Sequence, residues 1–209
     1  MLNQPKEFWN ARAQNYDLTS GEVYAEAYDK TAEHCFHYLK QSDQVLEFAC
    51  GTGLITFRIA PRVSHIHGID ISPKMVEAAQ KKVQAQGAAN VEITNTGLFD
   101  SCLKPESFDV LAAFNVLLYL PDLPAALTRI RELLKPNGVF LSATDCLGSR
   151  PSRAGFQKLI KSRTGAMPYT AFFTQRGLER KIARNGFAIL ERENLFPNPP
   201  NLFVAAQKV

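Results

Sequence analysis

Cysteine is scarce in this chain of 209 residues, and the four that occur are far apart. Cys35, Cys50, Cys102 and Cys146 show no short paired spacing and no accompanying histidine pattern. Disulfide frameworks and zinc sites usually need such pairs. We therefore expect neither disulfides nor a metal site. Cys50 lies in a tight turn, where a small side chain is expected to pack rather than to react.

Long apolar runs, internal repeats and low-complexity tracts are also missing. No stretch is long enough to span a bilayer, and the first residues lack the apolar segment of a secretion signal. Hydrophobic residues make up 45% of the chain and charged residues 21%, which is ordinary for a globular protein. We expect a cytoplasmic protein with a single domain.

The most informative stretch covers residues 44–60. Val45, Leu46 and Phe48 predict a short buried strand, and a helical pattern begins after Gly51 and Gly53. Glycines let the backbone approach a ligand closely, and the first helical turn offers free N–H groups. A strand, a glycine turn and a helix in this order are typical of a ligand site at the carboxyl edge of a parallel sheet.

A second predicted strand, residues 66–69, ends at Asp70, which lies 17 residues after Gly53. A carboxylate at about this spacing can bind both hydroxyls of a ribose. A dinucleotide site would favour glycine at position 56, where this chain has Thr56. Glu47, next to the turn, would repel phosphate and attract a cation. A positively charged nucleoside fits both carboxylates better than NAD does.

Four segments together resemble the class I S-adenosylmethionine-dependent methyltransferases of the small-molecule type. They are Glu47-Phe48-Ala49-Cys50-Gly51-Thr52-Gly53, Gly68-Ile69-Asp70-Ile71-Ser72, Ser107-Phe108-Asp109-Val110-Leu111 and Leu134-Lys135-Pro136-Asn137-Gly138-Val139-Phe140. The resemblance covers residues 44–145. It implies an α/β, Rossmann-like fold with a seven-stranded, mostly parallel sheet, helices on both faces and a C-terminal antiparallel hairpin strand.

The resemblance also implies the cofactor S-adenosyl-L-methionine and the product S-adenosyl-L-homocysteine. The residues expected to contact the cofactor are Tyr16, Glu47, Ala49, Cys50, Gly51, Thr52, Gly53, Asp70, Ile71, Met75, Thr96, Gly97, Leu98 and Asn115. Ala49 stands where the family usually has glycine. We expect it to keep an ordinary negative φ and to leave cofactor binding intact.

Asn115 follows the predicted strand 108–114 and, by the resemblance, faces the reactive methyl group. Enzymes that methylate nucleic-acid amino groups carry a polar residue, two prolines and an aromatic there, but Val116 and Leu117 follow Asn115. The similar sequence at 198–201 is expected to be only a hairpin turn. We therefore expect a small-molecule substrate and no nucleic acid.

No general base is evident from the sequence. The four histidines, His34, His37, His65 and His67, carry no catalytic pattern. The side chains expected nearest the pocket are Tyr16, Tyr28, Asn115, Tyr119 and Asp145. Two predicted helices, 5–16 and 22–39, precede the core and are expected to cover its ligand edge. Their aromatic residues either pack internally or form a lid over the cation.

We divide the domain into an N-terminal cap (1–40), a cofactor-binding core (44–145), a variable lid (146–173) and a C-terminal helix and hairpin (174–209). Residues 150–184 contain nine basic side chains and one acidic one. This basic segment is either a solvated surface, a site for an acidic substrate or a docking face for anionic lipid. Phe156, Leu159, Ile160 and Met167 are interleaved with its basic positions.

Three functions remain open from the sequence. The first is methyl transfer to a small or medium-sized, acidic or amphipathic metabolite. The second is a lipid or quinone methyltransferase that contacts membranes peripherally through the basic segment. The third is a non-catalytic module that binds S-adenosylmethionine. The sequence makes no prediction of the oligomeric state.

Overall fold

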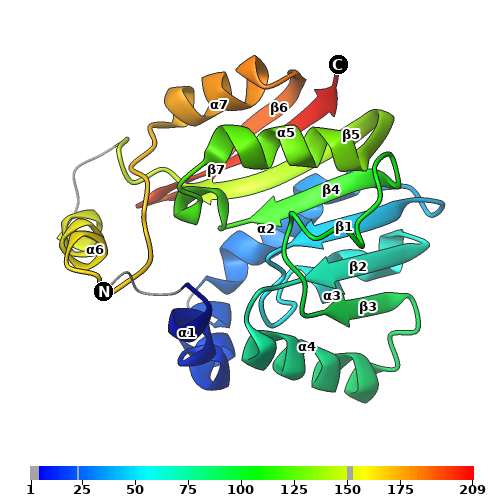
Figure 1. The fold of residues 1–209 in the computed structure, drawn as a ribbon, viewed down its shortest axis with the longest axis horizontal. Helices are drawn as coiled ribbons and strands as arrows, with labels where there is room; N and C mark the ends of the chain where they lie inside the picture. Colours follow the sequence, from blue (N-terminus) through cyan, green and yellow to red (C-terminus); the bar gives the residue numbers. More distant parts are fainter. Residues whose placement is uncertain (1–4, 23, 150–152) are drawn as a thin grey trace.

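The computed structural model describes residues 5–22, 24–149 and 153–209 (Figure 1). Val23, expected on the second helix, and Arg150, expected in the basic segment, lie outside the described residues. Within the described ranges, no helix has the length and apolar character needed to cross a membrane.

The core is a seven-stranded sheet with the strand order β3-β2-β1-β4-β5-β7-β6. Its strands are β1 (Gln44–Phe48), β2 (His65–Ile69), β3 (Val91–Thr94), β4 (Phe108–Phe114), β5 (Leu134–Asp145), β6 (Phe187–Pro197) and β7 (Pro200–Lys208). Strands β1 to β5 pair in parallel, while β7 pairs antiparallel with both β5 and β6. The predicted sheet, including its C-terminal hairpin, is confirmed. The strand order reverses between β1 and β4, where open α/β sheets bind their ligands.

Helices cover both faces of the sheet, as predicted (Figure 1). One face carries α2 (Ala25–Phe36), α3 (Thr56–Ile59) and α4 (Pro73–Gln86), and the other carries α5 (Leu123–Leu133) and α7 (Gln175–Arg184). Successive strand side chains point to opposite faces. Val45 therefore belongs to the first apolar core, and Leu46 belongs to the second.

Helix α4 has the bounds that its sequence predicts, because both ends carry clear signals. The Ser72 hydroxyl accepts a hydrogen bond from the Met75 N–H at 3.2 Å, and Pro73 occupies the first turn. Gly87 ends the helix in the left-handed conformation with φ of 61°. This helix places Met75 at the end of β2, beside the predicted nucleoside site.

The N-terminal segment differs from the single helix predicted over residues 5–16. Helix α1 (Pro5–Asn10) ends early and is followed by the short helical turns η1 (Ala13–Asn15) and η2 (Asp17–Gly21). The reason is a tertiary contact: the Asn10 side-chain oxygen accepts a hydrogen bond from the Ser72 hydroxyl at 2.7 Å. The cap therefore bends around the start of α4.

Two other helices are shorter than the sequence pattern suggests. The second predicted helix, 22–39, forms only over α2. The helix expected after the glycine turn is the single turn α3, which continues as a 3-10 turn, η3 (Ala60–Arg62). Such a short helix has little dipole to offer a ligand. The remaining elements, α6 (Arg153–Arg163) and η4 (Leu117–Tyr119), lie at the carboxyl edge of the sheet (Figure 1).

Candidate active site

The turn after β1 is built from left-handed backbone positions. Ala49 and Gly51 both have φ of 58°, and Gly53 has φ of 82°. The prediction that Ala49 keeps a negative φ is wrong, because this turn needs the left-handed conformation at that position. A Cβ atom added to Gly51 would meet nothing within 4 Å, so the backbone there borders open space. The turn leaves room for a ligand against its main chain.

Asp70, at the end of β2, is fixed by two backbone donors. Its Oδ2 accepts a hydrogen bond from Gly51 N at 3.0 Å, and its Oδ1 accepts one from Ser72 N at 2.8 Å. Burial raises the pKa of this carboxyl, and the two bonds partly oppose that shift. Each oxygen keeps a further lone pair. Asp70 thereby joins the glycine turn to α4 and remains able to accept hydrogen bonds from a ribose.

A cavity of about 410 Å³ lies over this turn. Its wall contains nine of the residues predicted to contact the cofactor, namely Tyr16, Ala49, Gly51, Asp70, Ile71, Met75, Gly97, Leu98 and Asn115. The segment after β3 adds Phe99 and Asp100, and the segment after β4 adds Val116, Leu120 and Pro121. A mostly apolar cavity with a few convergent polar groups is the usual form of a small-molecule site.

The other five predicted contacts, Glu47, Cys50, Thr52, Gly53 and Thr96, lie outside this wall. Glu47 points into the protein, where it accepts a hydrogen bond from the Thr56 hydroxyl at 2.6 Å. Its burial raises the pKa of the carboxyl to about 8. Because the β1 side chains alternate between faces, Glu47 points beneath the turn and not into the cavity. Of the two carboxylates that the sequence predicts beside the ligand, Glu47 and Asp70, only Asp70 lines the cavity.

Thr52 contacts the N-terminal cap and is not part of the cavity wall. Its hydroxyl donates to Asp17 Oδ1 at 2.6 Å, and Lys82 Nζ lies 2.6 Å from Asp17 Oδ2. Lys82 also donates to the carbonyl of Thr52 at 2.8 Å. This triangle fastens the cap to the glycine turn, and it positions the neighbouring Tyr16 over the ligand edge.

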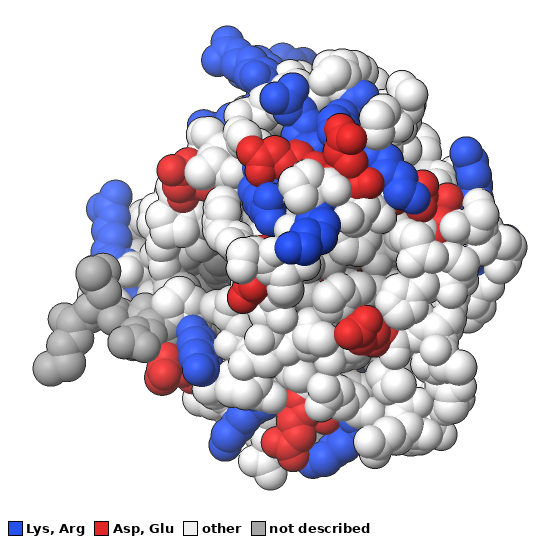
Figure 2. Space-filling model, turned by 45° about the vertical axis from the view of Figure 1, so that its right-hand side comes forward, with Lys and Arg blue, Asp and Glu red and all other residues white. Residues whose placement is uncertain are grey.

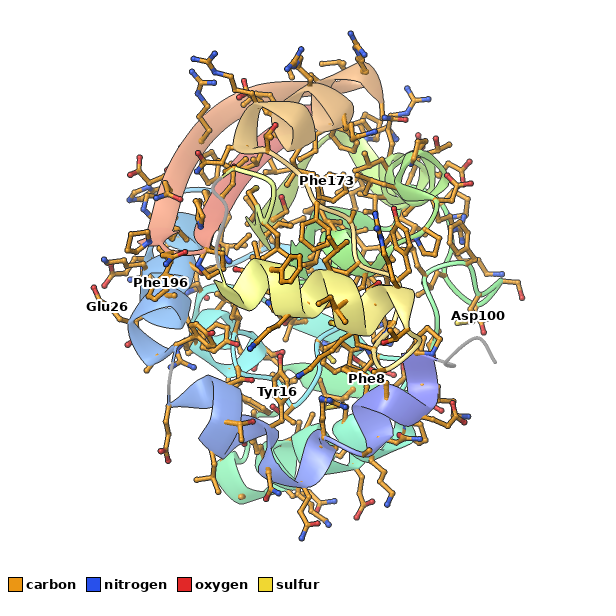
Figure 3. The ribbon with its side chains drawn as sticks, turned by 90° about the vertical axis from the view of Figure 1, so that its left-hand side faces the viewer. Phe8, Tyr16, Glu26, Asp100, Phe173 and Phe196 are labelled. Carbon is orange, nitrogen blue, oxygen red and sulfur yellow. The ribbon has the colours of Figure 1, made fainter. Side chains whose placement is uncertain are left out.

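A second cavity of about 740 Å³ lies beside the first, beneath α6. All five side chains predicted nearest the pocket line it: Tyr16, Tyr28, Asn115, Tyr119 and Asp145. Further aromatic residues in its wall are Phe8, Trp9, Tyr24 and Phe196. Figure 3 shows Phe8 and Tyr16 between α6 and the N-terminal helices, with Phe196 at the end of the hairpin. The cap thus supplies much of this wall, as the sequence predicts.

Four residues, Trp9, Tyr16, Asn115 and Tyr119, line both cavities. The Trp9 ring meets Tyr119 edge to face at a centroid distance of 5.3 Å and Tyr16 at 6.2 Å. Burial raises the pKa of Tyr16 and of Tyr119, so both phenols stay protonated near neutral pH. Trp9, Tyr16 and Tyr119 therefore form an aromatic boundary between the two adjoining cavities.

The polar side chains of the larger cavity converge at the ends of β4, β5 and β7. Asn201 Nδ2 donates to Asn115 Oδ1 at 2.8 Å and to Asp145 Oδ1 at 3.0 Å. Lys158 Nζ lies 3.4 Å from Asp145 Oδ2. Asp145 is the only carboxylate among the described residues that line this cavity. The sequence predicts only a hairpin turn over residues 198–201, so it gives no signal for the contacts of Asn201.

The basic segment separates into two surfaces. Lys158 and Lys161 of α6 line the larger cavity, as does Arg12 of the cap, whose guanidinium lies 3.4 Å from the centre of the Phe8 ring. The basic residues of α7 lie elsewhere. Figure 2 shows mixed basic and acidic side chains at the top of the molecule, where α7 lies. The exposed basic side chains of α7 therefore form a solvated surface.

The sequence from 46 to 140 matches the methyltransferase domain family. An aklanonic acid methyltransferase from Streptomyces sp. (strain C5) is 31% identical over 99 residues, which are 46% of this chain and 45% of that protein. A ubiquinone biosynthesis O-methyltransferase from Cereibacter sphaeroides is 27% identical over 165 residues, which are 76% of this chain and 66% of that protein. The matches thus span less than two thirds of either relative.

The fold agrees with this match. The crystal structure of an S-adenosylmethionine-dependent methyltransferase from Aquifex aeolicus superimposes with a TM-score of 0.74, covering 96% of this chain and 98% of that one, at 14% identity. The matched family segment spans the glycine turn, Asp70 and the strands that carry the smaller cavity. Residues 46–140 therefore match a methyltransferase domain, and the chain as a whole has the fold of an S-adenosylmethionine-dependent methyltransferase.

Proposed function

We propose that this protein transfers the methyl group of S-adenosylmethionine to a small or medium-sized anionic, amphipathic metabolite. One observation carries the proposal: the two cavities adjoin and share Trp9, Tyr16, Asn115 and Tyr119. The cofactor occupies the smaller cavity, with its ribose on Asp70 and its sulfonium at the shared boundary. The acceptor occupies the larger one.

This arrangement suits the chemistry of a sulfonium donor. Its methyl group is already activated, so the protein must mainly hold donor and acceptor in line, about 3 Å apart, and exclude water. The aromatic boundary serves both needs, because ring faces attract a cation and exclude water. The neutral product, S-adenosylhomocysteine, then loses this attraction.

The larger cavity favours an acceptor with an apolar body and an anionic group. Its wall combines the aromatic rings of the cap with Arg12, Lys158 and Lys161. Lys158 faces Asp145, whereas no acidic partner within hydrogen-bond range is seen for Lys161 in the described part of the chain. A carboxylate or phosphate of the acceptor is therefore expected to lie near Lys161, with its apolar part among the rings.

Asp145 is the residue best suited to take a proton from the acceptor. The carboxylate lines the cavity, and the Asn201 amide fixes one of its oxygens. Methylation of a hydroxyl releases a proton when the sulfonium becomes a neutral thioether, and a positioned carboxylate can receive it. We assign this role to Asp145.

The test is turnover of S-adenosylmethionine to S-adenosylhomocysteine with a panel of acceptors. The panel pairs each aromatic or prenylated carboxylate or phosphate with its uncharged ester or alcohol. We expect turnover that prefers the charged member of a pair. Calorimetric binding of the cofactor with no turnover on any acceptor would instead favour a non-catalytic module. A preference for the uncharged members would contradict the proposed substrate class.

A lipophilic acceptor delivered from a membrane is a second candidate. Phe156 and Ile160 lie four residues apart on α6 and have exposed fractions of 63% and 47%. They lie above the cavity that Lys158 and Lys161 line, as an interfacial helix would require. One relative of this chain is a ubiquinone biosynthesis O-methyltransferase. Flotation with anionic liposomes at low salt tests this candidate, and a protein that stays unbound would exclude it.

A further inference from the structure

Two histidines and a glutamate meet on the surface away from both cavities. His34 and His37 lie on the last turn of α2 and just beyond it, and Glu191 lies on β6. One potential ligand atom from each lies within 4.8 Å of the others. Neither cavity wall contains any of the three residues. The cluster therefore needs an explanation separate from methyl transfer.

The carboxylate of this cluster is held in place by neighbouring groups. Tyr38 donates its hydroxyl to Glu191 Oε2 at 2.7 Å, which leaves Oε1 directed at His34 Nδ1. The His34 ring also lies 5.2 Å from the Phe203 ring, so its orientation is restricted. Such outer contacts orient ligands in metal sites. Glu191 Oε1 and His34 Nδ1 share a hydrogen bond, and a cation could take the place of the proton between them.

We propose that His34, His37 and Glu191 bind a divalent transition-metal ion, with Zn²⁺ as the best match. Two imidazole nitrogens and one carboxylate oxygen suit zinc, whereas Mg²⁺ and Ca²⁺ favour oxygen ligands. The two histidines are three positions apart, so they lie on one side of the helix end. Three protein ligands leave a fourth position for water.

The site would link two walls of the larger cavity. Helix α2 supplies Tyr28 and Thr31 to that cavity, and β6 supplies Phe196. A metal bound to both elements would fasten α2 to the edge of the sheet. Because it binds the folded protein and not the separated elements, it would also stabilise the fold.

The experiment uses tag-free protein treated with a chelator and then titrated with ZnCl₂ in a calorimeter. We expect one Zn²⁺ per chain and a higher Tm in its presence. His37→Ala should abolish this binding, and Glu191→Gln should weaken it about tenfold or more. The double variant His65→Ala/His67→Ala removes two histidines outside the cluster and should bind as the unmodified protein does.

A second measurement separates this site from thiol binding. Cys102 is exposed and free, and could itself hold zinc. Cobalt bound to thiolate gives an intense near-ultraviolet charge-transfer band, which nitrogen and oxygen ligands do not give. We expect a Co²⁺ spectrum without that band, unchanged in Cys102→Ser and lost in His37→Ala. No Zn²⁺ binding by the unmodified protein, or stoichiometric binding that persists in folded His37→Ala, would overturn the proposal.

Discussion

Asn201 donates a hydrogen bond to the carboxylate of Asp145 at 3.0 Å, across the antiparallel pairing of β5 and β7. The two residues are direct partners in the strand register. The same amide group bonds Asn115 at the end of β4. One side chain from the hairpin thus orders the two polar groups that border the proposed acceptor.

Replacing Asp145 by asparagine should lower kcat strongly. The substitution keeps an oxygen that can accept from Asn201 but removes the group that takes the proton. We expect a loss of about 100-fold or more in kcat, with cofactor affinity unchanged. Turnover is measured on the acceptor found in the panel, with the exposed Asp29→Asn as control. Full activity in folded Asp145→Asn would contradict the assigned role.

Asp70→Ala should weaken cofactor binding by about 2 to 3 kcal/mol, because charge-assisted hydrogen bonds to the ribose are lost. Titration calorimetry with S-adenosylhomocysteine measures this loss without needing an acceptor. Since Asp70 also accepts from Gly51 and Ser72, thermal unfolding should accompany the titration. A folded variant with unchanged affinity would show that the ribose lies elsewhere.

Glu47 should make stability depend on pH. Burial raises its pKa from 4.5 to about 8, so the folded protein retains a proton that the unfolded chain loses in this window. The free energy of unfolding should therefore fall as pH rises from about 5 to 8, by up to about 1.4 kcal/mol per pH unit. Urea unfolding of Glu47→Gln should lack this contribution. If the difference in unfolding free energy between the unmodified protein and Glu47→Gln stayed constant across this pH range, Glu47 would not be the source of the pH dependence.

Ala49→Gly should stabilise the protein. The left-handed φ of 58° strains an alanine, and glycine adopts this φ without strain. Glycine also gives the unfolded chain more conformational freedom, which offsets part of the gain. We expect a net gain of about 0.5 to 1 kcal/mol in urea unfolding. Ala78→Gly, within the regular helix α4, is the matched control and should lose about 1 kcal/mol. Destabilisation by Ala49→Gly would mean that the alanine methyl contributes packing that outweighs the strain.

Lys161→Ala should raise KM for an anionic acceptor about fivefold and leave kcat nearly unchanged, since a partly solvated ion pair contributes about 1 kcal/mol. The effect should shrink at high salt. Arg176→Ala on the exposed surface of α7 is the control for a general change of charge. Equal effects of the two variants would argue against a specific contact at Lys161.

The sequence alone determined the sheet, its hairpin, helix α4 and the place of Asp70. Helix α4 and Asp70 follow from capping signals and spacing within short segments, whereas the sheet and its hairpin were implied by the resemblance of four segments to a known family. The sequence also indicates five residues that line the larger cavity, because each lies in the cap or near a strand end on the ligand edge. They are Tyr16, Tyr28, Asn115, Tyr119 and Asp145.

Only the tertiary structure decided the rest. The break in the first helix comes from the contact between Asn10 and Ser72, and the hydrogen bond that the buried Glu47 accepts comes from the Thr56 hydroxyl. The roles of Asn201 and Glu191 arise because the C-terminal hairpin folds back against distant segments, β5 and α2. A local pattern carries no signal for such pairings, because their partners are brought together by strand register and helix packing rather than by spacing along the chain.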